Sequence, residues 1–380
     1  MRRHPHLAGS AMLWGLQFSF LAPALTLLLV TLYGVPMAEV GWVIVAYQIA
    51  GFLAQLVIPA WADRRGDYLL PMLLAGLSTI ALTIALWLAT SLPLALAALI
   101  VFGAPAGAGS SMLFAELKHQ GATLPEVTQV RAVFSFAWMV GPPVATLVIG
   151  SFGPRWLLVA IALVAACNLA LTLAMMRRRT RAASPEHVLQ KPSGAPPKRL
   201  PVGLALLALS LTGASNTTAV SVITLFVTDH LHAAPLWAGL ALGLCATLEI
   251  PVLVASGRIG MHRSRFAMVT VGALLALVYY LGVLATSAPW MLLLLQVPNA
   301  VFIALSEGMG LAWVQEIVEA PGMGSGLFMN TRRIGAIGSG AVIALGSSGS
   351  AGIAGVFVVC AALAAASLVL LLVSGRMLAR

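Results

Sequence analysis

Charged residues are scarce in this chain: Asp, Glu, Lys and Arg make up only 8% of its 380 residues, while hydrophobic residues make up 60%. A soluble globular protein carries about 25% charged residues, so this composition excludes that class. Apolar runs of about 20 residues recur along the chain, and a helix of that length spans a hydrocarbon core about 30 Å thick. The composition therefore predicts an all-α polytopic membrane protein in contact with the lipid bilayer.

Cysteine is scarce too, and several functional motifs are missing. Cys167, Cys245 and Cys360 lie far apart within apolar runs, which suits neither a disulfide framework nor a metal site, so we expect no metal and no cofactor. The chain has no G-x-x-x-x-G-K-[ST] sequence, so we do not expect it to consume ATP. The seven histidines lie near the termini or in expected loops. With no buried catalytic cluster available, an enzyme is not expected.

The apolar runs predict twelve transmembrane helices. The first follows the charged start "MRRHPH", but its apolar stretch is longer than the about 7–15 residues of a signal-peptide core, so we expect it to be retained. The expected spans are residues 9–32, 39–61, 68–90, 93–116, 131–150, 155–176, 201–228, 234–256, 265–286, 289–315, 327–347 and 351–374.

Acidic residues are few, with 11 Asp and Glu against 21 Lys and Arg. With twelve spans, every Lys and Arg except Arg155 falls on one side of the membrane or at helix ends that face it, which is the asymmetry that marks the cytoplasmic side. We therefore expect both termini to be cytoplasmic. The net charge of +10 is explained by this topology and by contact with anionic lipids, and no nucleic acid is expected as a partner.

One polar segment interrupts the apolar pattern. Residues 177–200 read "RRRTRAASPEHVLQKPSGAPPKRL", a basic stretch with Pro, Ser and Gly that cannot bury enough apolar surface to fold alone. We interpret it as a flexible cytoplasmic linker. It divides the chain into an N-terminal six-helix bundle, residues 1–176, and a C-terminal six-helix bundle, residues 201–380.

The two halves resemble each other weakly. "PAWADRRGD" (59–67) follows the second span, and "VASGRIG" (254–260) follows the eighth, at an offset near 194. Taken together, ordered matches at offsets of 194 to 201 indicate duplicated bundles, the repeat pattern by which secondary transporters alternate access. The matched residues are Gln55 with Glu249, Glu116 with Glu316, and, one residue further along, Arg131 with Arg332.

The loop "ADRRGD" (62–67) resembles the signature loop of the major facilitator superfamily. Asp63, Arg64, Arg65 and Gly66 match it, while Pro59 replaces the usual leading glycine. The resemblance implies twelve helices in two six-helix bundles, with the acid and the basic residues locking the cytoplasmic helix ends. The superfamily's fifth-helix antiporter pattern is matched only at Gly141–Pro142.

Longer stretches are similar to the bacterial sugar efflux transporter branch of that superfamily, in that family's order and over essentially the whole chain. They are "RAVFSFAWMVGPP" (131–143), "LEIP" (248–251), "LQVPNAVFI" (295–303) and "LFMNTRRIG" (327–335). The resemblance implies a secondary active exporter of small sugars or glycosides, driven by proton antiport, in the bacterial cytoplasmic (inner) membrane. A monomer is the expected functional form. The alternative is a multidrug or other small-molecule proton-coupled exporter of the same fold.

Two acids lie within predicted spans, Glu249 and Glu307. An ionised side chain near a helix centre costs about 2.5–3.5 kcal/mol, unless it is protonated or faces a cavity or a cation. Changing between these states is the physical basis of proton coupling, and we interpret both as proton-coupling residues. The alternative for each is a structural acid that is hydrogen-bonded to a neighbouring helix.

Uncharged amides suit a sugar, because its hydroxyls donate and accept hydrogen bonds at once, and an aromatic ring can stack on its apolar face. The predicted substrate-binding residues are Trp14, Gln17, Asn216, Gln296 and Asn299, on the spans that line the central cavity in the superfamily. The same amides can instead hold helices together. A passive channel would need a continuous polar lining, which these residues do not supply.

Charged residues near span ends form a predicted cytoplasmic gate. The arginines can alternatively extend to lipid headgroups, but the repeated Glu116–Arg131 and Glu316–Arg332 spacing favours a gate. The predicted gate residues are Asp63, Arg64, Glu116, Arg131, Glu316 and Arg332.

Overall fold

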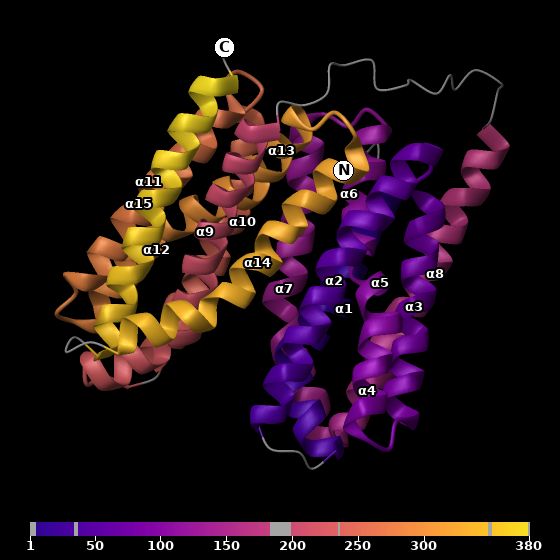
Figure 1. The fold of residues 1–380 in the computed structure, drawn as a ribbon, viewed down its shortest axis with the longest axis horizontal. Coiled ribbons are helices and arrows are strands. Elements are labelled where there is room, and N and C mark those ends of the chain that lie inside the picture. The colour runs from indigo at the N-terminus through magenta and orange to yellow at the C-terminus, as the bar shows by residue number, and fades with distance from the viewer. Residues whose placement is uncertain (1–4, 34–36, 183–198, 235, 349–351, 379–380) are drawn as a thin grey trace. The chain divides into compact units, whose positions relative to one another are not determined.

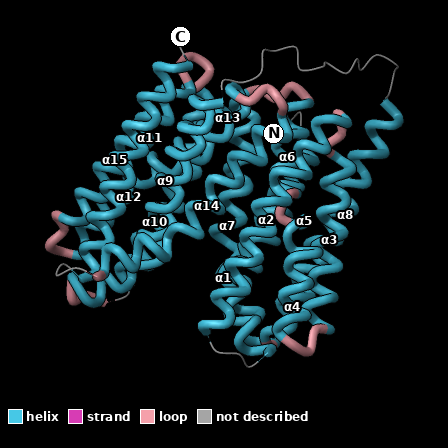
Figure 2. Tube along the Cα trace, in the orientation of Figure 1, coloured by secondary structure: helices cyan, strands magenta, loops and turns pink. Residues whose placement is uncertain are grey.

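The computed structural model describes residues 5–33, 37–182, 199–234, 236–348 and 352–378. Every regular element in those ranges is a helix (Figures 1 and 2). Within the described residues, ten helical segments are long and apolar enough to cross a membrane. The all-α class predicted from composition is therefore confirmed.

The helices of the first half follow the predicted spans closely, with the fourth span divided into short pieces. They are α1 Pro5–Tyr33, α2 Met37–Arg65, α3 Leu69–Leu88, α4 Leu92–Ala98, η1 Leu99–Gly103, α5 Ala104–Ala106, α6 Gly109–His119, α7 Leu124–Phe152 and α8 Pro154–Ala182.

The second half repeats this order, with the seventh and tenth spans divided. Its helices are α9 Arg199–Leu225, η2 Phe226–His230, α10 Leu236–Ile259, α11 Arg265–Leu284, α12 Pro289–Ala304, η3 Leu305–Met309, α13 Gly310–Ile317, α14 Pro321–Ser347 and α15 Gly352–Leu378.

Each of the twelve predicted spans overlaps a helix within the described residues, but the first and eleventh, in α1 and α14, are not among the ten segments that meet the spanning criterion. The count of twelve therefore stays a prediction. At the predicted linker, α8 continues to Ala182, beyond the expected end of the span at 176. Residues 183–198 of the linker lie outside the described residues.

Local sequence explains several helix boundaries. After α2, Gly66 adopts a φ of 62°, a left-handed conformation that glycine adopts without the cost of a Cβ. Ser264 caps α11, because its Oγ accepts a hydrogen bond from the Ala267 amide that has no partner within the helix. Pro154 and Pro321 begin α8 and α14, at a position where a missing amide proton costs nothing.

The chain folds into two compact units. Unit 1 comprises Met1–Thr123, Gln129–Ser193 and Ala320–Gly326, and unit 2 comprises Leu124–Thr128, Gly194–Glu319 and Leu327–Arg380. The units follow the two sequence halves except at two short segments. The first turn of α7 belongs to unit 2, and the first turn of α14 belongs to unit 1.

In unit 1, α8 packs along both α1 and α3. Ser10 on α1 donates a hydrogen bond of 2.8 Å to Asn168 on α8, and Gln55 on α2 donates one of 2.9 Å to the carbonyl of Gly107. Such bonds between membrane helices average about 0.6 kcal/mol. Phe20, with leucines of α1, α3 and α8, forms an apolar core.

In unit 2, α9 packs along α15, and α10 packs along α12. Ser367 and Ser374 on α15 each donate a hydrogen bond of 2.8 Å to a carbonyl of α9. The apolar core contains Phe226, Tyr280 and Phe357. The π-turns η2 and η3 interrupt the helices around this core, and such turns are rare and occur frequently at functional sites.

Candidate functional site

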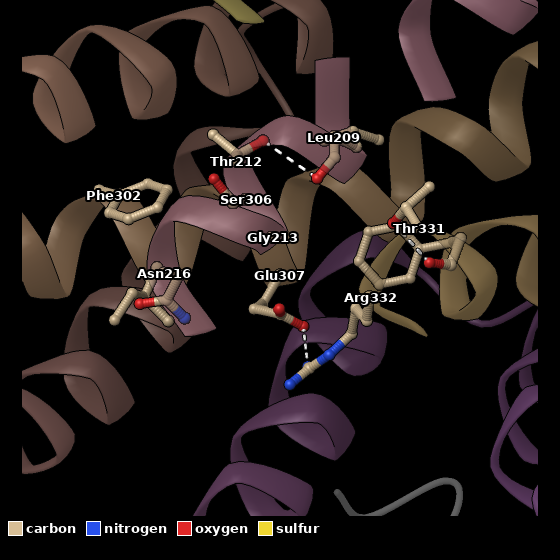
Figure 3. Close-up of a pocket in the computed structure, with 11 residues that line it drawn as sticks. Leu209, Thr212, Gly213, Asn216, Phe302, Ser306, Glu307, Thr331 and Arg332 are labelled. Atoms are coloured by element: carbon tan, nitrogen blue, oxygen red, sulfur yellow. Dashed lines mark hydrogen bonds and ion pairs between the residues drawn. The ribbon is translucent and has the colours of Figure 1, made fainter. Parts of the chain in front are cut away.

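A pocket in unit 2 lies between α9, α12, η3 and α14 (Figure 3). Its polar lining carries one acid, one arginine, one amide and three hydroxyls. The lining residues are Leu209, Thr212, Gly213, Asn216, Phe302, Ile303, Ser306, Glu307, Phe328, Thr331 and Arg332. The cavity has a volume of about 30 Å³, which is room for one or two waters.

The acid and the arginine of this pocket form an ion pair. Glu307 Oε2 accepts a charge-assisted hydrogen bond from Arg332 Nη1, and Figure 3 shows the two side chains pointing toward each other. The Glu307 side chain is 15% exposed and that of Arg332 is 42% exposed. Glu307 is held toward α14 by the π-turn η3. The pair lets an acid lie in an apolar bundle without an uncompensated charge.

Of the five predicted substrate-binding residues, Asn216 lies in this pocket. Gln296 and Asn299 do not line it. They are buried on α12, where Asn299 Nδ2 donates to Gln296 Oε1 at 2.9 Å and to Cys245 Sγ of α10 at 3.3 Å. The two amides lie on one face of α12, and Asn299 reaches α10 from that face. These two amides act in this conformation as contacts between helices.

The other predicted coupling acid, Glu249, is half-buried on α10, one turn after Cys245. It does not line the pocket that contains Glu307. In this conformation the two predicted coupling acids therefore do not share this pocket, and any coupling role of Glu249 would be exercised at a separate place on α10.

Trp14 and Gln17 lie on α1 in unit 1 and are almost completely buried. Trp14 packs against Gly109 of α6, where an added Cβ would overlap the indole ring. The Gln17 amide has no hydrogen-bond partner among the described residues, either at its oxygen or at its nitrogen. The indole N–H of Trp14 has none there either. A buried amide without partners costs about 1–3 kcal/mol.

Among the predicted gate residues, Asp63 makes the best-defined contact. Its carboxylate accepts hydrogen bonds of 2.7 Å each from the amides of Gly322 and Met323 in the first turn of α14. Tyr68 donates a third bond of 2.7 Å. The N-terminus of a helix attracts negative charge, because its first amides have no partner within the helix. Arg64 beside it is exposed.

Arg131 and Glu116 are both buried in unit 1. The guanidinium of Arg131 lies over the rings of Phe114 and Phe134, at 5.7 and 5.1 Å from their centroids. Glu116 accepts a hydrogen bond from Gln120 and lies 4.0 Å from Arg179.

Glu316 pairs with Arg265 at 2.9 Å, whereas the repeated spacing had suggested Arg332. The difference arises because Glu316 lies near the end of α13, which packs on α11, where Arg265 is the first residue. Arg332 is bonded to Glu307 in the preceding π-turn. Arg332, a predicted gate residue, therefore forms an ion pair within the pocket.

Sequence reasoning missed Arg179 and Arg265. Arg179 was assigned to the linker, yet it lies on α8 and pairs with Asp67 at 3.3 Å. No sequence signal would have identified its partner, because the basic run from Arg177 onward is uniform. The hydroxyls of Thr212, Ser306 and Thr331 were also missed, although each lies within four residues of Asn216, Glu307 or Arg332.

Comparison with known proteins decides the family. Residues 7–339 match the model of the Major Facilitator Superfamily. The chain belongs to the major facilitator superfamily. It is therefore a multi-pass membrane transporter and not an enzyme, as the sequence predicted.

Curated relatives within the major facilitator superfamily cover nearly the whole chain. A protein of Deinococcus radiodurans named as a sugar efflux transporter is 31% identical over 96% of both chains. Sugar efflux transporter A of Dickeya chrysanthemi is 27% identical over 90% of this chain and 89% of its own. Sugar efflux transporter C of Escherichia coli is 27% identical over 87% and 86%. These relatives place the chain in the sugar efflux transporter family.

Solved structures agree on the major facilitator fold. A bacterial homologue of the iron transporter ferroportin, in its outward-facing state, has a TM-score of 0.78 at 13% identity, over 99% of this chain and 100% of that one. The transporter FucP in its outward conformation has a TM-score of 0.75 at 12% identity, over 98% of both chains. At these identities the likeness is one of fold.

Proposed function

We propose that the chain exports small sugars or glycosides across the bacterial inner membrane by proton antiport and alternating access. Both termini lie in the cytoplasm, and the monomer is the working form. The observation that carries this proposal is the Glu307–Arg332 ion pair in a pocket that also contains Asn216 and hydroxyl groups.

An ion pair makes the pocket electrically neutral. The positive charge of Arg332 cancels that of the ionised Glu307, so the pocket does not attract a cation in the way that an isolated carboxylate does. Uncharged ligands with many hydroxyls fit this environment, because Asn216 donates and accepts hydrogen bonds, Glu307 accepts them and Arg332 donates them. This favours sugars over cationic drugs.

Competition for the Glu307 oxygens explains antiport. An ionised carboxylate is an acceptor only, and protonation turns one of its oxygens into a donor. A sugar hydroxyl and a proton therefore compete for the same atoms. A sugar that binds the ionised form inside is released outside when the lower pH protonates Glu307, and the proton then returns inward.

Trp14 and Gln17 are the proposed substrate contacts of unit 1. A buried amide that lacks partners gains the full benefit of a ligand's hydroxyls, since no existing bond is lost. Trp14 adds an aromatic ring and an indole donor one turn away. Glu249 remains a proposed second coupling residue.

The test is sugar flux into and out of proteoliposomes. Labelled lactose, glucose and a simple glucoside would be followed with and without an imposed pH gradient, for wild type, Glu307→Gln and Glu249→Gln. We expect gradient-driven flux in wild type and downhill exchange alone in Glu307→Gln. Asp229→Asn, an exposed acid in η2, is the matched control and should behave as wild type.

Two outcomes contradict the proposal. Sugar flux that ignores the pH gradient in wild type would exclude proton antiport. Transport of a cationic dye without any sugar would instead establish the multidrug alternative, and would show that the ion pair opens to expose Glu307.

A further inference from the structure

The π-turn η3 makes two sets of contacts within unit 2. Glu307 contacts Arg332 on α14. The next two residues, Gly308 and Met309, face the end of α10 and the first turn of α7. A Cβ added at Gly308 would overlap Leu253 Cδ1 of α10 and lie 3.8 Å from Thr128 Cγ2 of α7. Met309 Sδ lies 3.1 Å from the position that an added Cβ would take at Gly260. The proposed proton site and a helix-end contact are thus adjacent along one short turn.

The contact between the first turn of α7 and the end of α10 leaves little free space. At Gly257 an added Cβ would overlap Thr128 Oγ1 and lie 3.1 Å from the α-carbon of Pro125. At Gly260 it would lie 2.7 Å from Leu124 Cδ2. Packed surfaces of this kind are bistable and do not deform continuously. A displacement of η3 is therefore expected to break this contact.

A π-turn provides a means of displacement. The amide of Gly310 bonds to the carbonyl of Leu305, five residues earlier, which leaves one residue more in the turn than an α-helix holds. Conversion to an α-helical turn shifts the register of the residues that follow. Breaking the bond to Arg332 removes one of the contacts that hold Glu307 in the turn.

Charged and titratable side chains lie on the elements around η3, the turn that carries Glu307. Arg332 contacts Glu307 directly, and Arg265 is paired with Glu316. The titratable side chains of the surrounding helices are Glu126 and Arg131 on α7, Arg199 on α9, Cys245, Glu249 and Arg258 on α10, Arg265, Tyr279 and Tyr280 on α11, Glu316 on α13, and Arg332 and Arg333 on α14.

We infer that η3 is a transmission element that couples the ionisation of Glu307 to the contact between the first turn of α7 and the end of α10, with Gly308 and Leu253 as positioning residues. The inference rests on the proposed function, because it needs Glu307 to exchange a proton. When Glu307 is ionised and paired, the contact is closed. When Glu307 is protonated, η3 is released and the contact opens.

Hydrogen exchange tests the inference without any substrate. The amides of residues 128–132 bond to the carbonyls of the first turn of α7, so their protection reports on it. In wild type, we expect protection to be lower at about pH 4 than at about pH 7.5 by about fivefold, after correction for intrinsic exchange, the low end of coupling between two sites. In Glu307→Gln protection should be low at both pH values, and Asp229→Asn should follow wild type.

A rescue experiment tests the two positioning residues. Gly308→Ala introduces a methyl group that overlaps Leu253, so it should open the contact at both pH values. Leu253→Ala in the same chain removes the overlap and should restore both protection and its pH dependence. Gly243→Ala, on α10 where an added Cβ meets nothing within 4 Å, is the control for a glycine substitution alone.

The outcomes separate the inference from the proposed function. If wild-type sugar flux follows the pH gradient but protection at 128–132 is the same in wild type and Glu307→Gln, the inference is overturned while the proposed function stands. Protection that changes with pH equally in Glu307→Gln would also overturn it, because another group would then carry the signal. Lack of rescue by Leu253→Ala would remove Gly308 and Leu253 from the pathway.

Discussion

Asp63 in unit 1 and Gly257 in unit 2 are aligned by the predicted repeat, at an offset of 194 residues. Each lies near the end of a helix that meets the first turn of another. Asp63 accepts two hydrogen bonds from α14 amides. Gly257 provides only space, which Thr128 of α7 fills. The two aligned positions thus serve an electrostatic contact in one unit and a steric contact in the other.

The difference separates two kinds of control. The Asp63 contact depends on charge, so salt affects it. The Gly257 contact depends on shape, so it responds to displacement of the helices that pack there, α7 and α10. The two contacts therefore differ in sensitivity although the predicted repeat aligns them.

The largest effect is expected from Gly257→Val. Overpacking costs about 1–3 kcal/mol, and here the new side chain meets both Thr128 and the backbone of Pro125. Thermal unfolding in detergent should show the loss of stability. Gly243→Val on the same helix should lose much less, and equal losses in the two variants would show that the Gly257 contact is not close.

Asp63→Ala should come next, because it leaves two α14 amides without their acceptor. Loss of a side chain that caps a helix N-terminus costs about 0.5–2 kcal/mol. Hydrogen exchange at Gly322 and Met323 should accelerate, and Asp63→Asn, which keeps one amide-oxygen acceptor, should accelerate it less. Unchanged exchange in Asp63→Ala would mean that the contact contributes nothing in solution.

Salt distinguishes the two contacts without mutation. Charge at a helix N-terminus is worth about 0.3–1 kcal/mol at low ionic strength and is screened by salt. Raising the salt concentration should therefore accelerate exchange at residues 322–323 more than at residues 128–132, which salt affects only through the Glu307–Arg332 pair. Equal acceleration at both would contradict the assignment of the Gly257 contact to packing.

The smallest effect is expected from Glu316→Gln. Its partner Arg265 and Glu316 itself are 34% and 54% exposed, and exposed pairs contribute about 0.3 kcal/mol. Glu116→Gln, its buried counterpart in unit 1, should lose more stability. Unfolding temperatures of the two variants check this order, and a large loss in Glu316→Gln would give the exposed pair a structural role.

The helices were predictable because length and apolar composition alone decide whether a segment spans a bilayer. The common face of Gln296 and Asn299 was predictable for a similar reason, since an interval of three residues fixes it. The neighbour that this face contacts was not predictable, because the apolar residues around the two amides can equally border lipid, a second helix or a cavity. The Glu307–Arg332 pair was missed because a π-turn, which no periodicity reveals, positions Glu307.

The buried amide of Gln17 has a consequence for evolution. Replacing an unbonded polar group in a core by an apolar one of similar shape is neutral or stabilising, so Gln17→Leu should yield a chain that withstands more heat. Drift toward stability would therefore remove this residue if nothing opposed it. Its presence in the core is a standing cost, of the kind that proteins bear where activity and stability conflict.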